Sequence, residues 1–111
     1  MLFALLCGHA ISDFALQSES MGLGKSRHKK PPYIPKGIRE QTVWLYYLTA
    51  HAFINGGVVY LITQSQALGI AETIIHWIID FCKTEGWINP HRDQMFHLLS
   101  KIVYCVVLGV I

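Results

Sequence analysis

Each apolar segment of the sequence carries a histidine that lies four residues from a second polar side chain. The pairs are His9 with Asp13, His51 with Asn55, His76 with Asp80, and Asp93 with His97. On an α-helix this spacing puts both side chains on one face, about 6 Å apart at Cβ, where they can share a ligand or a proton. Ionisable pairs in apolar surroundings are costly, and inside a membrane each would mark a functional site. We therefore expect helices that each direct one histidine toward a common interior.

Histidine nitrogens and carboxylate oxygens at this spacing indicate metal binding. Both are good ligands of first-row metal ions, with zinc as the plainest choice, and a catalytic site would keep one position for water. The predicted metal ligands are His9, Asp13, His51, His76, Asp80, Asp93 and His97. Two other interpretations remain open. An aspartate one turn from a ligating histidine could instead fix its tautomer, or the pairs could form a hydrogen-bonded polar core without a metal.

Hydrolysis is the reaction class that fits these residue types best. A bound metal ion lowers the pKa of a water molecule toward neutrality and polarises a phosphoester or ester, while a spare aspartate acts as base. The predicted catalytic residues are Asp80 and Asp13. Gln17, Lys25 and Gln94 are predicted to bind an anionic headgroup, which basic residues attract at a membrane surface. The predicted substrate is therefore a lipid, or a lipid-linked phosphoester or ester, at the cytoplasmic leaflet.

Composition indicates the elements that must position these residues. The 111 residues are 52% hydrophobic and 14% charged, with a mean hydropathy of +0.37, which is too apolar for an ordinary soluble protein of this size. The apolar residues fall in four segments, each near the ~17–25 residues needed to cross a bilayer. We predict an all-α four-helix transmembrane bundle, one integral membrane domain over residues 1–111, with helices at about 1–18, 39–63, 67–83 and 90–111. The alternative, a soluble four-helix bundle, fits poorly because residues 58–62 and 105–111 are apolar on all sides.

Residues 19–38 form the only long loop that the sequence predicts. Prolines, glycines and basic residues there exclude a regular buried element. Short loops rich in lysine and arginine stay in the cytoplasm, so we expect a multi-pass protein of the inner membrane with this loop cytoplasmic and both termini outside. The site should then open toward the cytoplasm, and Glu72 should be a wet carboxylate at the outer interface. The loop could also be basic only because topology requires it, without binding a headgroup.

The polar motifs form a series along the chain. They are His9-x-x-x-Asp13-Phe14-x-Leu16-Gln17, Met21 with Lys25, the lone helical His51, His76-x-x-x-Asp80-x-x-Lys83, and Asp93-Gln94-x-x-His97. The series resembles that of the DUF3307 family, small bacterial and phage membrane proteins without an assigned function. It is also similar in pattern to the YdjM-like group of membrane-bound metal-dependent hydrolases, which place histidine and aspartate pairs on transmembrane helices. The resemblance implies a small integral membrane protein, and the pattern similarity implies metal-dependent hydrolysis.

A non-enzymatic membrane protein is the alternative function. It would be an ion or proton conduit, or a phage-encoded factor that acts on the host membrane or its defence, with a structural core of histidine and aspartate. A conduit needs polar residues through both leaflets, whereas residues 58–62 and 103–111 are almost wholly apolar, so the enzyme is preferred. The expected partners in either class are the lipid bilayer and anionic lipid headgroups, with no nucleic acid. A homo-oligomer is left open.

Overall fold

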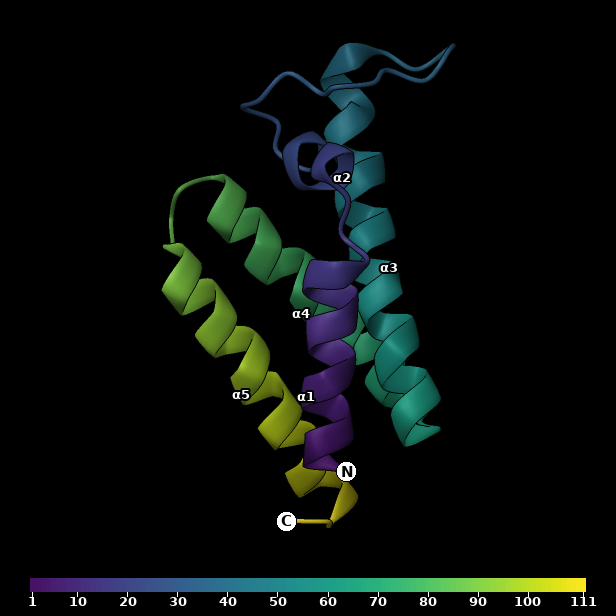
Figure 1. Cartoon of the computed structure of the whole chain (residues 1–111), viewed down its shortest axis with the longest axis vertical. Coiled ribbons are helices and arrows are strands. Elements are labelled where there is room, and N and C mark those ends of the chain that lie inside the picture. The colour runs from purple at the N-terminus through teal and green to yellow at the C-terminus, as the bar shows by residue number, and fades with distance from the viewer.

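The computed structural model describes residues 1–111 and contains only helices and connecting segments (Figure 1). The helices are α1 Leu2–Ala10, the π-helix η1 Ile11–Ala15, α2 Glu19–Gly24, the 3₁₀-helix η2 Glu40–Thr42, α3 Val43–Thr63, α4 Gln66–Thr84 and α5 Pro90–Leu108. The long helices α1, α3, α4 and α5 alternate in direction, so both termini lie at one end of the bundle and α2 lies at the other (Figure 1). The predicted all-α class is confirmed.

Three of the four predicted helices match the structure within a few residues at their ends. The predicted segments 39–63, 67–83 and 90–111 correspond to η2 with α3, to α4 and to α5. The first helix is shorter than predicted, because η1 ends at Ala15. The prediction of no regular element over 19–38 is wrong for residues 19–24, which form α2. Ser18 caps α2 by accepting a hydrogen bond from the backbone N–H of Met21 at 3.1 Å, and the buried Gly24 packs on the ring of Tyr47.

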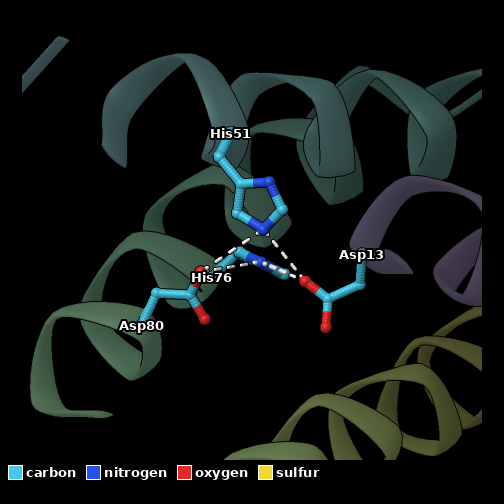
Figure 2. A group of neighbouring side chains, drawn as sticks. All are labelled: Asp13, His51, His76 and Asp80. Atoms are coloured by element: carbon cyan, nitrogen blue, oxygen red, sulfur yellow. Dashed lines mark hydrogen bonds and ion pairs between the residues drawn. The ribbon is translucent and has the colours of Figure 1, made fainter. Parts of the chain in front are cut away.

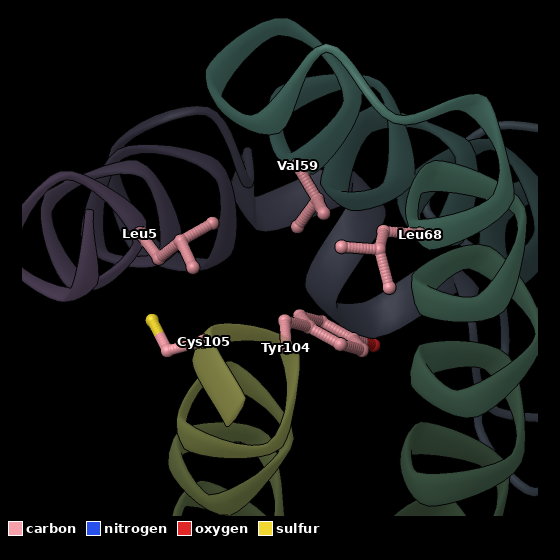
Figure 3. Packing of buried hydrophobic residues seen from close by; sticks show 5 residues of the cluster. All are labelled: Leu5, Val59, Leu68, Tyr104 and Cys105. Carbon is pink, nitrogen blue, oxygen red and sulfur yellow. The ribbon is translucent and has the colours of Figure 1, made fainter. Parts of the chain in front are cut away.

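The interior is mostly polar and the exterior is mostly apolar. Hydrophobic residues from α1, α3, α4 and α5 form one small buried cluster, which consists of Leu5, Val59, Leu68, Tyr104 and Cys105 (Figure 3). By contrast, Phe3, Phe53 and Val107 are 80%, 64% and 67% exposed. Buried polar and charged residues outnumber buried hydrophobic ones. This distribution is the reverse of the one that water-soluble proteins show.

Helices α3 and α4 cross at a point where only small residues fit. A Cβ atom on Gly56 of α3 would collide with Oγ1 of Thr73 and with the carbonyl oxygen of Gly69 on α4. The Thr73 hydroxyl donates to that same carbonyl at 2.9 Å. Small residues let two helix backbones approach closely. The close approach brings His51 of α3 beside His76 of α4, with ring centroids 4.9 Å apart.

By length and composition, one helix can cross a membrane: the continuous segment Glu40–Thr63, formed by η2 and α3. The segment Leu2–Ala15 is apolar but shorter. Helices α4 and α5 have 19 residues each, but they carry more polar side chains than α3 does. Length and composition thus identify one candidate span, and not the four that the sequence predicts.

Candidate metal centre

All seven residues predicted as metal ligands meet inside the bundle. They are His9 and Asp13 from α1 and η1, His51 from α3, His76 and Asp80 from α4, and Asp93 and His97 from α5. Each is at most 5% exposed. We call this set the polar cluster. Four long segments of the chain therefore contribute to one buried site.

Four members of the polar cluster, Asp13, His51, His76 and Asp80, point toward a common centre (Figure 2). Nε2 of His51 lies 2.9 Å from Oδ1 of Asp13 and 3.4 Å from Oδ2 of Asp80. Nε2 of His76 lies 3.3 Å from the same Asp13 oxygen and 3.4 Å from the same Asp80 oxygen. Each residue offers one ligand atom within 4.8 Å of the others. We call these four residues the quartet.

The separations within the quartet suit a small divalent cation. Metal–ligand distances of about 2.0–2.2 Å in a tetrahedral zinc site put neighbouring ligand atoms about 3.3–3.6 Å apart. The four separations of 2.9–3.4 Å are close to this value. The buried Nε2 of His76 makes no hydrogen bond although it faces two carboxylates. The buried histidines and aspartates could therefore hold a metal ion.

Asp13 reaches the quartet from the π-helix η1. Single π-turns of this kind occur frequently at functional sites. The hydroxyl of Ser12 donates to Oδ1 of Asn55 at 2.7 Å, which ties η1 to α3. The Asn55 side chain in turn donates to the backbone carbonyl of His51 at 3.0 Å. The sequence predicts the pairing of His51 with Asn55 on one helix face, and the structure adds that Asn55 connects α3 to η1.

Glu72 is a member of the site that the sequence interpretation missed. The expectation of a wet carboxylate is wrong, because Glu72 is fully buried. Its Oε1 accepts from Nζ of Lys101 at 2.7 Å and its Oε2 accepts from the hydroxyl of Tyr104 at 2.6 Å. Oε1 also lies 3.2 Å from Nδ1 of His76. The four-residue spacing of Glu72, His76 and Asp80 along α4 was the available signal.

Lys25 lies inside the protein rather than at its surface. Its side chain is almost fully buried, and its Nζ donates to Oδ2 of Asp80 at 2.9 Å and to Oε1 of Gln17 at 2.6 Å. Lys25 follows α2 directly, so the short helix that the sequence did not predict is the element that positions this lysine. Lys25 and Gln17 therefore adjoin the quartet, and neither is a freely exposed headgroup ligand.

The remaining part of the polar cluster lies on α1 and α5. Nε2 of His97 lies 3.1 Å from Oδ1 of Asp80 and 3.3 Å from Oδ1 of Asp93. Gln94, which the sequence predicts to bind a headgroup, donates from Nε2 to Oδ2 of Asp13 at 2.9 Å. The Oε1 of Gln94 lies 2.9 Å from Nε2 of His9. Gln94 therefore connects α5 to α1 within the site.

A polar cavity of about 650 Å³ lies at the loop end of the bundle and reaches Lys25. No hydrophobic residue lines it, and Lys29 and Lys83 add positive charge. Its one acidic residue, Glu85, bonds to Arg27. The hydrogen bond from Arg27 keeps the pKa of the Glu85 carboxyl below its usual range. The cavity therefore presents mainly positive charge, on the side where the sequence predicts the opening of the site.

Comparison with known proteins places this chain in a family. A family model described as "Protein of unknown function (DUF3307)" matches residues 1–111. The chain belongs to the DUF3307 family. The resemblance of the motif series is thus confirmed over the whole chain. Searches among curated proteins and among solved structures each gave no significant match.

In this DUF3307 chain, the separate motifs of the series converge on one site. The histidines and aspartates form the polar cluster, Gln17 and Lys25 adjoin it, and Lys83 lines the cavity that leads to it. The polar members of the series therefore lie together at one site, although they come from segments far apart in the sequence.

Proposed function

We propose that this protein is a metal-dependent membrane hydrolase that acts on a lipid, or on a lipid-linked phosphoester or ester, at the cytoplasmic leaflet. The observation that carries the proposal is the quartet, whose four buried ligand atoms all lie within 4.8 Å of one another. Zinc is the ion that we expect, because imidazole and carboxylate groups bind it well. Such an ion polarises an ester and lowers the pKa of a water molecule toward neutrality.

The burial pattern supports a location in the bilayer. Helices in contact with lipid must expose apolar side chains and satisfy polar groups internally. Phe3 of α1, Phe53 of α3, Ile74 of α4 and Val107 of α5 are each more than half exposed, while the polar cluster is enclosed. We infer four spanning segments, with the bilayer thinned around the short first one. The basic residues between α2 and η2 support a cytoplasmic position for this loop.

Asp80 is the member of the quartet that we assign as general base. Four protein ligands form a closed site, whereas a catalytic site keeps one position for water. Asp80 makes contacts that would compete with binding of the ion. Nζ of Lys25 lies 2.9 Å from its Oδ2, and Nε2 of His97 lies 3.1 Å from its Oδ1. The two quartet histidines and Asp13 would hold the ion. Asp80 would then take a proton from water at the fourth position.

The polar cavity supports an anionic substrate. Lys25 lies between the cavity and Asp80 and is held there by Gln17. A phosphate group that enters the cavity would attract the Lys25 ammonium away from Asp80. This movement would free Asp80 to act as base only when substrate is present. Lys29 and Lys83, which also line the cavity, would contribute to binding through their charge.

The test of the proposal compares Asp80→Asn with the wild type in liposomes. The variant keeps the side-chain volume and removes the base, and general bases contribute about 10²–10⁴-fold to rate, so we expect a loss of that size. Liposomes would contain phospholipids and lipid-linked phosphates, with products followed by mass spectrometry. Glu40→Gln is the matched control, because Glu40 is an exposed carboxylate outside the polar cluster. Equal product profiles for wild type and Asp80→Asn, at equal metal content, would exclude hydrolysis through this site.

An ion or proton conduit is the weaker candidate. Its path would have to continue from the polar cluster to the end of the bundle that holds both termini. The buried hydrophobic cluster drawn in Figure 3 comes from the parts of α1, α3, α4 and α5 that lie between the polar cluster and that end, so it would block such a path. A hydrogen-bonded polar core without metal is the other non-enzymatic candidate, and metal analysis distinguishes it from the hydrolase.

A further inference from the structure

We propose that the polar cluster holds two divalent cations, with the Asp13 carboxylate bridging them. This inference rests on the metal centre of the proposed function and adds a second ion to it. The first ion lies in the quartet. The second lies on the opposite side of Asp13, where Asp93 and His97 of α5 are its further ligands.

The two oxygens of Asp13 face different sets of partners. Oδ1 lies 2.9 Å from Nε2 of His51 and 3.3 Å from Nε2 of His76, on the quartet side. Oδ2 lies 2.9 Å from Nε2 of Gln94 and 3.7 Å from Nε2 of His9, on the side of α5 and α1. A carboxylate with one oxygen on each side is suited to bridge two ions.

The second position has its own set of ligand atoms. Asp13, Asp93 and His97 each offer one ligand atom within 4.8 Å of the other two. Oδ1 of Asp93 lies 3.3 Å from Nε2 of His97. This oxygen belongs to a side chain that is 1% exposed, and it has no hydrogen-bond partner. Buried polar atoms are nearly always paired, so an unpaired carboxylate oxygen among other ligands points to a cation.

The pairing of charges in the site also favours a cation beside Asp13 and Asp93. The cluster and its surroundings bury the carboxylates of Asp13, Glu72, Asp80 and Asp93. Lys101 pairs with Glu72, and Lys25 pairs with Asp80. Asp13 has no lysine partner, and Asp93 has only Lys83, whose side chain is 27% exposed and lies 3.4 Å away. The second position therefore uses the two carboxylates that buried lysines leave uncompensated.

Two ions would each stabilise a different oxygen atom during hydrolysis. Two-metal sites hold their ions about 3.5–4 Å apart and stabilise both the attacking and the leaving oxygen. In phosphoester hydrolysis, water would add to phosphorus at the first ion and give a proton to Asp80. The ester P–O bond would break at the second ion, and the leaving oxygen would take that proton back. The second ion thereby matches a phosphoester substrate.

Manganese provides a readout that does not depend on activity. Metal-stripped full-length protein in detergent would be titrated with Mn²⁺, with stoichiometry from calorimetry and coupling from electron paramagnetic resonance. We expect two ions in the wild type, with the exchange-coupled spectrum of a bridged pair. Asp93→Asn should bind one ion with an uncoupled spectrum. The control Glu40→Gln should match the wild type.

The outcomes separate this inference from the metal centre on which it rests. No bound Mn²⁺ in the wild type would overturn both proposals. One ion in the wild type would overturn the second position and leave the quartet in place. Two ions without coupling would exclude the bridge through Asp13. His97→Gln serves as a second variant if Asp93→Asn fails to fold, and the wild-type stoichiometry decides the question independently of either variant.

Discussion

Glu72 lies one helical turn before His76 on α4, and its Oε1 is 3.2 Å from Nδ1 of that histidine. A carboxylate at Nδ1 keeps the proton on this nitrogen and leaves Nε2 free to bind a metal ion. Nε2 of His76 is the atom that faces Asp13 and Asp80 in the quartet. Lys101 and Tyr104 hold Glu72 from the other side. The pair of Glu72 and His76 therefore links the candidate metal centre to α5.

Glu72→Gln should affect both the stability and the metal affinity of the protein. It leaves the Lys101 ammonium buried without its counter-charge, and breaking a buried ion pair costs about 3–5 kcal/mol. Loss of a group that orients a metal-bound histidine lowers metal affinity about 10–100-fold. Unfolding in detergent would measure the first effect, and calorimetric titration with zinc would measure the second.

A double variant separates these two effects. Glu72→Gln combined with Lys101→Met removes the uncompensated charge, so most of the lost stability should return. The metal affinity should stay low, because His76 still lacks its carboxylate partner. Wild-type zinc affinity in the folded double variant would show that Glu72 only pairs with Lys101.

Metal binding should be tight and should depend on pH. Histidines bind a metal ion only when deprotonated, so affinity should fall as pH drops through about 6.5, the ordinary histidine pKa. Elemental analysis of detergent-purified protein should find bound zinc or a similar divalent ion, and chelation should lower the unfolding temperature. Negligible metal together with unchanged stability after chelation would favour a purely hydrogen-bonded polar core.

Gly56 and Gly57 provide a matched pair for testing the packing of α3 on α4. Gly56→Ala places a methyl group against Thr73 and the Gly69 carbonyl, and overpacking of this kind costs about 1–3 kcal/mol. Gly57→Ala meets no atom within 4 Å, so it should be neutral or stabilise the helix by about 0.5–1 kcal/mol. Unfolding of both variants in detergent is the measurement. Equal stability of the two variants would contradict the close crossing.

Cysteine labelling tests the membrane topology. Lys30→Cys in the basic loop and Gln66→Cys at the start of α4 would be introduced separately, after removal of the native cysteines Cys7, Cys82 and Cys105. Both positions are exposed. An impermeant maleimide added to intact cells should label Gln66→Cys only, because basic loops remain cytoplasmic. Labelling of Lys30→Cys from outside would reverse the topology.

The sequence by itself determined which residue types form the site and which helices carry them. The pairs of His9 with Asp13 and of His76 with Asp80 are visible because helix geometry is local and puts residues four apart on one face. The residues that mark the start of a helix are also neighbours in the sequence. Asn89 accepts a hydrogen bond from the backbone N–H of Arg92 at 2.8 Å, as expected of a capping residue before Pro90.

Only the tertiary structure decided which of these residues form the quartet. It also decided which other side chains join the site. Lys25 contacts Asp80, 55 positions along the chain, and Glu72 contacts Lys101, 29 positions away. Neither contact has a local pattern, because each depends on how the helices cross. A lysine in a basic loop and a glutamate near a helix end are ordinarily exposed. They are buried here because the packed bundle supplies each with a partner of opposite charge, which no spacing along one helix can specify.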